Sequence, residues 1–235
     1  MDKTCINAQN SVVFACSSML GHLKAANQSL GTDIPVIPLG RQTHVFPSDM
    51  RQKIRELCAQ LPDSIEYILF AMGWSPETWK GLTLSRTAVI PDFDDCVSIL
   101  LANADDQVGD LKQKGHMYYR DSDGGQYSIR AILESAQKEY GMEPGTTVFG
   151  SWFADYVSLD IIDTGAYDCY AEGFVARAEE DAQLIRVPVD FVQGSNLVCE
   201  KLLSGQWDDQ FVVLAPGEEA AAGRFRTQPN MLWEY

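Results

Sequence analysis

The sequence predicts an α/β fold with a doubly wound, mostly parallel sheet and helices on both of its faces. Two observations predict this fold class. Short apolar runs rich in β-branched residues alternate with segments of helical periodicity, which is typical of βα units around a parallel sheet. The composition, 46% hydrophobic and 22% charged over 235 residues, suits a globular protein with a substantial core.

The predicted elements begin with a buried strand at Ser11–Cys16, which is a largely apolar run. A helix follows, with Ser17 and Ser18 as its cap and Gly31 as its end. Residues 34–39 contain two prolines, which cannot donate to a sheet ladder. They therefore predict a short strand at the periphery of the sheet.

The next predicted element is a helix over residues 47–61, because their apolar side chains recur at helical spacing. Residues 67–70 and 87–90 predict the third and fourth strands, each followed by a polar loop and a new helix. Residues around 105–127 are less regular and rich in turn formers, which predicts an irregular insertion in the fold.

The βα alternation resumes with a predicted helix at Ile129–Tyr140, which Gly141 closes. The later predicted elements are a strand at 158–162, a helix at 172–181, a strand at 184–189, a helix at 195–203 and a last strand at Phe211–Leu214. Together they predict a single Rossmann-like α/β domain over residues 1–217, with a loosely attached C-terminal extension over 218–235.

The charge of the chain excludes several classes of partner. Lys and Arg number 18 against 33 Asp and Glu, a formal net charge of −15, so no basic stripe serves nucleic acid or an anionic membrane. No run approaches the roughly 18 apolar residues of a membrane span, and no secretory signal is visible. We therefore expect a soluble cytoplasmic protein. Its six cysteines lack CxxC pairs and are expected to be reduced, most of them buried.

Candidate site residues directly follow the predicted strands, because ligands of an open parallel sheet bind at the carboxyl ends of its strands. This edge collects thiols, an imidazole, carboxylates and an aromatic ring, as a metal or cofactor site requires. The candidate metal ligands are Cys16, His44, Asp95 and Cys96. The candidate ligand-binding residues are Gly73, Trp74, Ser75, Asp163 and Thr164.

Cys16 is the first of the two candidate thiols and stands between a strand and a helix N-terminus. The helix dipole and free backbone N–H groups favour the thiolate there, which makes Cys16 a candidate nucleophile or metal ligand. Cys96 has the same placement before an apolar helix. The alternative for each is a small buried residue of the core.

An acidic run, Asp92, Asp94 and Asp95, lies in the loop before Cys96. Carboxylates at this position cap the following helix, or they bind a cation or act as a base beside a thiolate. His44 lies on a loop that begins with glycine, which suits a ligand better than an apolar helix face does. Its alternative is an exposed loop histidine.

The Asp163-Thr164-Gly165 triplet resembles an aspartic-protease motif by its letters alone, because those enzymes need two such loops in an all-β setting. One copy in an α/β chain suits instead a ligand hydroxyl or a helix cap. No GxGxxG, GxxxxGK[ST] or GxSxG motif is present. A dinucleotide fingerprint, a P-loop and a hydrolase elbow are therefore not supported.

The order and spacing of short motifs resemble a prokaryotic family, domain of unknown function 1638, over most of residues 11–217. The motifs that carry the resemblance are residues 14–16 ending at Cys16, 67–82 with Gly73 and Gly81, 89–102 with Asp95 and Cys96, 161–165 with Asp168, and 202–217 with Trp207 and Asp208. The family occurs near corrinoid-dependent methyltransferase systems. The resemblance therefore implies a role in anaerobic one-carbon metabolism, with association to a corrinoid or a methyltransferase-system protein.

The chain departs from the family pattern at two positions. Members usually have His-Asp-Cys where this chain has Asp94-Asp95-Cys96, and usually a Cys at the position of Ser75. If the family's Cys and His residues form a metal site, this chain has lost a thiol and an imidazole from it.

Three hypotheses for the function follow. The first is a metal- or cofactor-binding protein, whose thiolates and imidazole suit zinc or iron and whose partner is a small molecule or metal. The second is a metal-independent enzyme with Cys16 as nucleophile. The third is a non-catalytic accessory subunit, in which Tyr118, Tyr119 and the segment 233–235 are contact surfaces, with a homo-oligomer as one form of assembly.

Overall fold

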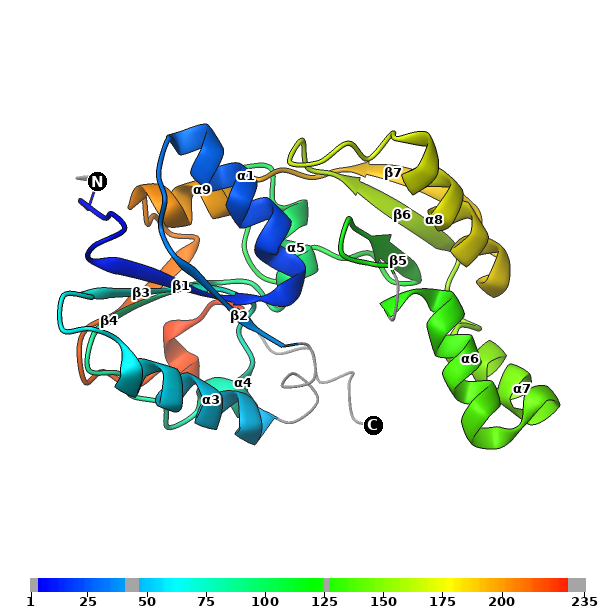
Figure 1. Ribbon diagram of the computed structural model, residues 1–235, viewed down its shortest axis with the longest axis horizontal. Coiled ribbons are helices and arrows are strands. Elements are labelled where there is room, and N and C mark those ends of the chain that lie inside the picture. The colour runs from blue at the N-terminus through cyan, green and yellow to red at the C-terminus, as the bar shows by residue number, and fades with distance from the viewer. Residues whose placement is uncertain (1–3, 41–46, 125–126, 228–235) are drawn as a thin grey trace. The chain divides into compact units, whose positions relative to one another are not determined.

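A computed structural model describes residues 4–40, 47–124 and 127–227 (Figure 1). The chain divides into two compact units: unit 1 comprises Met1–Leu111 and Ser195–Tyr235, and unit 2 comprises Lys112–Gly194. Each unit has a sheet with helices, and most strands are parallel, so the predicted α/β class is confirmed. The single domain over 1–217 stays a prediction.

The sheet of unit 1 has five strands in the order β2-β1-β3-β4-β8, and only the pairing of β4 with β8 is antiparallel. The strands are β1 (Ser11–Cys16), β2 (Val36–Leu39), β3 (Tyr67–Ala71), β4 (Thr87–Pro91) and β8 (Phe211–Leu214). Pro38 lies in β2 and Pro35 just before it, and β2 is at the edge of the sheet, as the two prolines of residues 34–39 predict. The strand order reverses between β1 and β3, which makes their carboxyl ends the switch point of the sheet.

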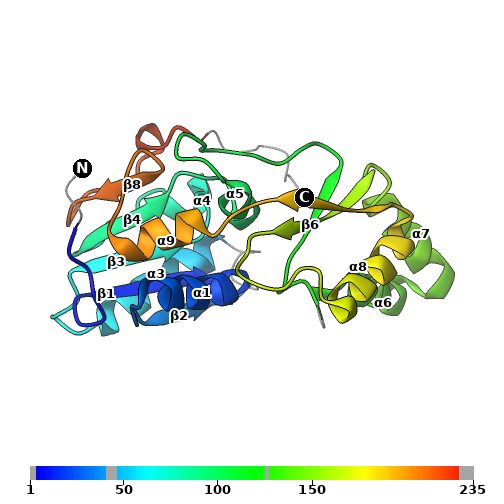
Figure 2. The same cartoon turned by 90° about the horizontal axis from the view of Figure 1, so that it is seen from above.

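Helices cover both faces of this sheet (Figures 1 and 2). The helical segments of unit 1 are η1 (Ser17–Met19), α1 (Leu20–Leu30), α3 (Pro47–Gln60), α4 (Pro76–Trp79), α5 (Cys96–Leu101), α9 (Leu197–Ser204) and η3 (Ala222–Arg224). The helices α1 and α9 lie side by side on one face, and α3 covers the other. Gly31 ends α1 at φ 63°, the left-handed conformation that its glycine predicts. In the core, Phe70 contacts Phe14 and Trp79 edge to face.

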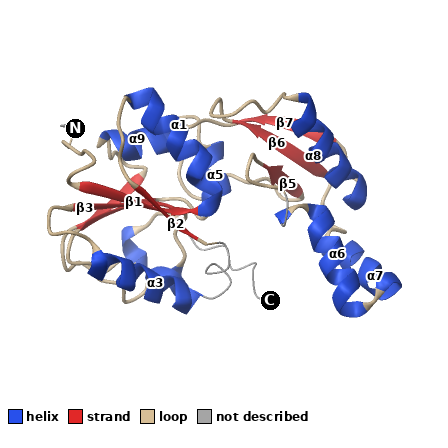
Figure 3. Cartoon of the chain, in the orientation of Figure 1, coloured by secondary structure: helices blue, strands red, loops and turns tan. Residues whose placement is uncertain are grey.

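Unit 2 is built on a second, fully parallel sheet of three strands, β5-β6-β7 (Figure 3). Its elements are β5 (His116–Tyr119), α6 (Ile129–Tyr140), α7 (Met142–Trp152), β6 (Ser158–Asp163), α8 (Glu172–Ile185) and β7 (Val189–Gln193). The expected irregular insertion over 105–127 thus contains β5, the edge strand of this sheet. Hydrophobic side chains of β6, α6 and α8 form the core of the unit.

The structure differs from the predicted elements of unit 2 in two places, a strand that is wrong and a helix that was not predicted. The strand expected at 184–189 is the end of α8 and the turn after it, because Ala178, Ala182 and Ile185 continue one buried helical face and Arg186 then turns left-handed at φ 61°. Helix α7 was not expected, because its sequence contains a proline and two glycines. Gly145 allows α7 to approach α6, since a Cβ there would lie 2.5 Å from Gln137 Cα.

The C-terminal extension is packed onto unit 1 as far as the structure describes it. Ala220, Phe225 and Thr227 are buried, and the ring of Phe225 stacks on that of Trp74 with centroids 4.8 Å apart. Loose attachment is therefore wrong for residues 218–227. The proposed contact residues 233–235 lie outside the described residues.

Of the other expected contact residues, Tyr119 is 2% exposed, and its hydroxyl donates to Asp181 at 3.2 Å. It is therefore a core residue of unit 2 and not a contact surface. Among the helices that the structure describes, none has the length and apolarity to cross a membrane.

Candidate functional site

The candidate site of unit 1 is a pair of thiols joined by one hydroxyl at the carboxyl edge of its sheet. Cys16 ends β1, and Cys96 is the first residue of α5, after β4. Ser18 Oγ lies 3.0 Å from Cys16 Sγ and donates to Cys96 Sγ at 3.4 Å. Cys16 and Ser18 are buried, whereas Cys96 is partly exposed. The structure thus brings together the two sulfurs that the sequence singled out.

The direction of these hydrogen bonds distinguishes the two thiols. A hydroxyl has one proton, and Ser18 donates it to Cys96. The S–H of Cys16 is then left to donate to Ser18 Oγ, and Cys96 Sγ accepts from Ser18. Ser18 was expected to cap a helix, but no side-chain cap is present at η1 or α1. Its hydroxyl forms hydrogen bonds with the two thiols instead.

Asp95, the residue before Cys96, has the capping role that the sequence left open. Its Oδ1 accepts from the backbone N–H groups of Val97 and Ser98, each at 2.9 Å. Two bonds from the first turn fix the start of α5 and therefore the position of the Cys96 sulfur. Because Oδ1 of Asp95 already accepts these two hydrogen bonds, a metal ion would compete with the helix for this oxygen.

Asp92 anchors the C-terminal segment. It is 2% exposed, and its carboxylate accepts from the backbone N–H groups of Arg226 and Thr227 and from the Thr227 hydroxyl, at 2.9, 3.1 and 2.6 Å. This carboxylate is fully engaged in holding residues 226–227 against β4. Its role in the structure is architectural.

The loop after β3 contains the expected ligand-binding residues Gly73, Trp74 and Ser75. Gly73 packs so closely on the loop after β4 that a Cβ would lie 2.3 Å from Asp95 Cα. Trp74 is buried beneath Phe225, and Ser75 Oγ donates to the Thr78 hydroxyl at 3.0 Å at the start of α4. Gly73 therefore packs against the loop that carries Cys96, whereas Trp74 contacts the C-terminal segment and Ser75 caps the start of α4.

Asp163 and Thr164 belong to unit 2, at the carboxyl end of β6. Asp163 accepts from the hydroxyl of Tyr170 at 2.9 Å and from the N–H of Gly165 at 3.2 Å. Both bonds are local to the loop between β6 and α8. The remaining candidate, His44, lies outside the described residues. Within the described ranges, no group of three or more His, Cys, Asp and Glu side chains could hold a metal ion.

Three of the other cysteines are buried structural residues, as most of the six were expected to be. Burial raises the pKa of the Cys58 thiol to about 11 and that of Cys199 to about 12. Burial and the nearby Asp163 carboxylate raise the pKa of Cys169. Their protonated thiols are poor nucleophiles and ligands at neutral pH.

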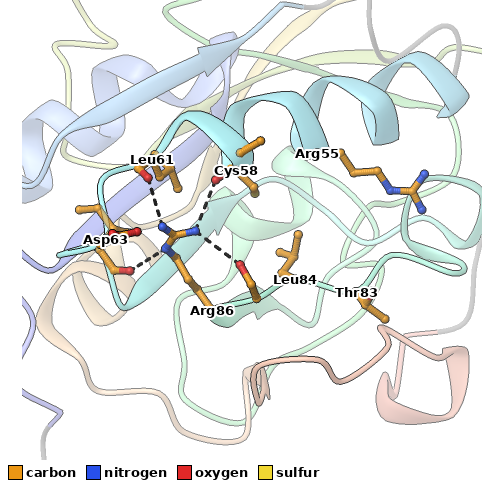
Figure 4. A pocket seen from close by; sticks show the side chains of 10 residues that line it. Arg55, Cys58, Leu61, Asp63, Thr83, Leu84 and Arg86 are labelled. Atoms are coloured by element: carbon orange, nitrogen blue, oxygen red, sulfur yellow. Dashed lines mark hydrogen bonds between the residues drawn. The ribbon is translucent and has the colours of Figure 1, made fainter.

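The opposite, amino end of the strands contains a cavity of about 720 Å³ that the sequence did not indicate (Figure 4). Arg86, just before β4, donates from Nε to the carbonyl of Ile65 at 2.7 Å and from Nη2 to that of Leu61 at 3.1 Å. It also donates to Cys58 O, in the last turn of α3, at 3.4 Å. Arg86 thus satisfies carbonyls that α3 leaves free, which is a structural role.

Fold and site together define an α/β protein with a hydroxyl-linked thiol pair at the switch point of its larger sheet. The family model described as protein of unknown function (DUF1638) matches residues 39–203, most of the chain. The chain belongs to this family, as the motif order predicted. Neither the curated proteins nor the solved structures include a match to the chain.

Proposed function

We propose that the protein binds a soft transition-metal ion, free or within a cofactor, through Cys16 and Cys96. The observation that supports this proposal is the pair of sulfurs on one hydroxyl, Ser18 Oγ, at 3.0 and 3.4 Å. Thiolates are the protein ligands that zinc and iron prefer, and a partner that orients a ligand strengthens metal binding.

Two thiolates leave coordination positions for further ligands. A catalytic zinc site uses three protein ligands and keeps a position for water or substrate. In this proposal His44 supplies an imidazole and a small molecule occupies an open position. Asp95 acts beside the metal as the cap that fixes Cys96, because its Oδ1 is occupied by two N–H groups.

Family membership extends the proposal to metabolism. The resemblance implies anaerobic one-carbon chemistry, so we propose that the metal or cofactor site serves a corrinoid-dependent methyltransferase system. The acidic chain, with its net charge of −15, favours a cationic or metal-bound partner over a phosphate-rich one.

Elemental analysis of protein purified without oxygen tests the proposal. We expect about one equivalent of zinc or iron, or its uptake on titration, and weaker uptake in C16S and in C96S. The exposed Cys5 provides the matched control, and C5S should bind as the wild type does. Less than about a tenth of an equivalent of every transition metal, with no uptake on titration, contradicts the proposal.

A second candidate function is a cysteine enzyme without a metal, and the hydrogen-bond direction bears on it. The sequence placed the nucleophile at Cys16, but Cys16 is buried, whereas the sulfur of Cys96 is partly exposed and accepts a hydrogen bond from Ser18. An accepted hydrogen bond stabilises a thiolate. If the protein is such an enzyme, iodoacetamide alkylates Cys96 before Cys16 near neutral pH. Equally slow alkylation of both cysteines contradicts this second function.

A further inference from the structure

A second cluster of chemically active side chains lies in unit 2, on β5 and β6. Nδ1 of His116 lies 2.7 Å from Oδ2 of Asp160, and Ser158 Oγ donates to the other carboxylate oxygen. Ser158 and Asp160 are each 5% exposed, whereas the side chain of His116 is 27% exposed. A buried carboxylate therefore holds a ring that reaches the surface.

The register of the sheet explains this arrangement. β5 and β6 are parallel, and His116 is the partner of Ser158 at the amino end of both strands. Asp160 lies two residues further along β6. Because side chains alternate along a strand, Asp160 shares a face with Ser158, opposite the core residues Leu159 and Ile161.

The bond to Asp160 determines which ring nitrogen carries the proton. An ionised carboxylate only accepts hydrogen bonds, so Nδ1 of the neutral ring is protonated and Nε2 carries the lone pair. Within the described residues, the hydrogen bonds of the His116 ring end at Asp160 and leave Nε2 without a protein partner. This nitrogen is available to a molecule from solution.

The choice of histidine distinguishes this pair from the other ion pairs of unit 2. Arg120 binds Asp123 at 3.0 Å, and Arg130 lies 3.9 Å from Glu180. In both of these pairs the partner of the carboxylate is a permanently charged arginine. Asp160 is more deeply buried than either carboxylate, yet its partner is an imidazole, which can take up or release a proton at a ring nitrogen. A histidine in this position is suited to proton transfer rather than to fold stability alone.

We propose that His116 is the acid–base residue of a second site, in unit 2, with Asp160 as its positioning residue. Nε2 takes a dissociable proton from an uncharged substrate, and the electron pair of the broken bond stays on the substrate. Nδ1–H remains bonded to Asp160 throughout. An anionic substrate is disfavoured, because Asp190 occupies the register position beside Asp160 on β7.

An uncharged probe, 5-nitrobenzisoxazole, tests the proposal. A base removes its C–H proton, the electron pair of that bond forms a nitrile, and the N–O bond breaks to release a coloured phenolate. We expect the rate constant of the full chain to exceed that of H116Q at least about tenfold. R130Q breaks an exposed ion pair of the same unit and should keep the wild-type rate. Equal rates for the wild type and a folded H116Q overturn the proposal.

The role of Asp160 has its own readout. In D160N we expect the rate to fall severalfold and the ¹⁵N signals of His116 to show less of the Nδ1–H tautomer. If D160N only lowers stability and leaves rate and tautomer unchanged, Asp160 does not position the ring. Circular dichroism of each variant separates loss of the base from loss of the fold, and D160E should restore part of the rate.

Discussion

The Ser18 hydroxyl donates to the Cys96 sulfur at 3.4 Å, although 78 positions separate the two residues in the chain. The same oxygen lies 3.0 Å from Cys16 Sγ. One buried hydroxyl thus couples the loop after β1 to the start of α5. Removing it changes how both thiols are held while leaving both thiols in the protein.

We predict that S18A weakens zinc binding by about tenfold, because a partner that orients metal ligands contributes about this much. Its unfolding free energy should fall by about 1 kcal/mol, the typical contribution of one hydrogen bond. S11A removes another buried hydroxyl, at the amino end of β1, and should leave zinc affinity unchanged. Competitive titration with a chromophoric chelator measures the zinc affinity of both variants. Equal affinities for S18A and S11A contradict the prediction.

Gly73 should be intolerant of any side chain. In G73A the new Cβ would lie 2.3 Å from Asp95 Cα, so backbone must move, at about 1–3 kcal/mol or more. A Cβ added at Gly150, in α7, would have no neighbour within 4 Å, and G150A should stabilise by about 0.5–1 kcal/mol. Urea unfolding measures both variants. Equal and small effects would show that the loops after β3 and β4 can separate freely.

The cap on α5 should be measurable as stability of unit 1. D95A removes two hydrogen bonds of 2.9 Å, and we expect a loss of about 1 kcal/mol. S128A removes the corresponding cap of α6 in unit 2, whose hydroxyl accepts from Ala131 N at 3.1 Å, and should cost a similar amount. Hydrogen exchange assigns each loss to its unit. Unchanged protection in α5 of D95A counts against a capping role.

The Thr227 hydroxyl should control attachment of the C-terminal segment. T227V keeps the shape of the side chain but removes the bond of 2.6 Å to Asp92, leaving a buried carboxylate with fewer donors. A loss of about 1 kcal/mol raises the detached population about fivefold, so proteolysis within 218–227 should accelerate by that factor. T147V removes an exposed hydroxyl of α7 and should cleave at the wild-type rate.

Stability should decline at alkaline pH because of the buried thiols. Burial raises the pKa of Cys199 to about 12 and that of Cys58 to about 11, from an ordinary value of 9.0. The folded state holds these thiols protonated. The stability that depends on this protonation is therefore fully present below pH 9.0, and it is lost as the pH rises through the pKa values of the thiols in the folded state. C199A should show a shallower decline of unfolding free energy above pH 9.0, and C5A the wild-type slope.

Local sequence signals predicted most of the fold where neighbouring residues decide it. The buried strand at Ser11–Cys16, the edge strand β2 with Pro38 and the turn at Gly31 each appear as expected. The division into two sheets was not predictable, because the sequence of a strand does not specify which other strands it pairs with. Strand pairing depends on distant contacts, and these leave no local signal.

The same distinction applies to the candidate site. Strand ends predicted that Cys16 and Cys96 lie at one edge, since carboxyl ends of parallel strands meet there. The role of Ser18 was missed because a serine after a strand also signals a helix cap. The pairing of His116 with Asp160 was missed because it depends on the register of β5 against β6, which the sequence does not specify.

The central claim is that Cys16 and Cys96 bind one metal ion together. X-ray absorption at the zinc edge of anaerobically loaded protein tests it most directly, because sulfur ligands at about 2.3 Å are distinguished from nitrogen and oxygen at about 2.0–2.1 Å. We predict two sulfur scatterers in the wild type and in C5S, and one in C16S and in C96S. A shell of nitrogen and oxygen alone in the wild type would contradict the claim.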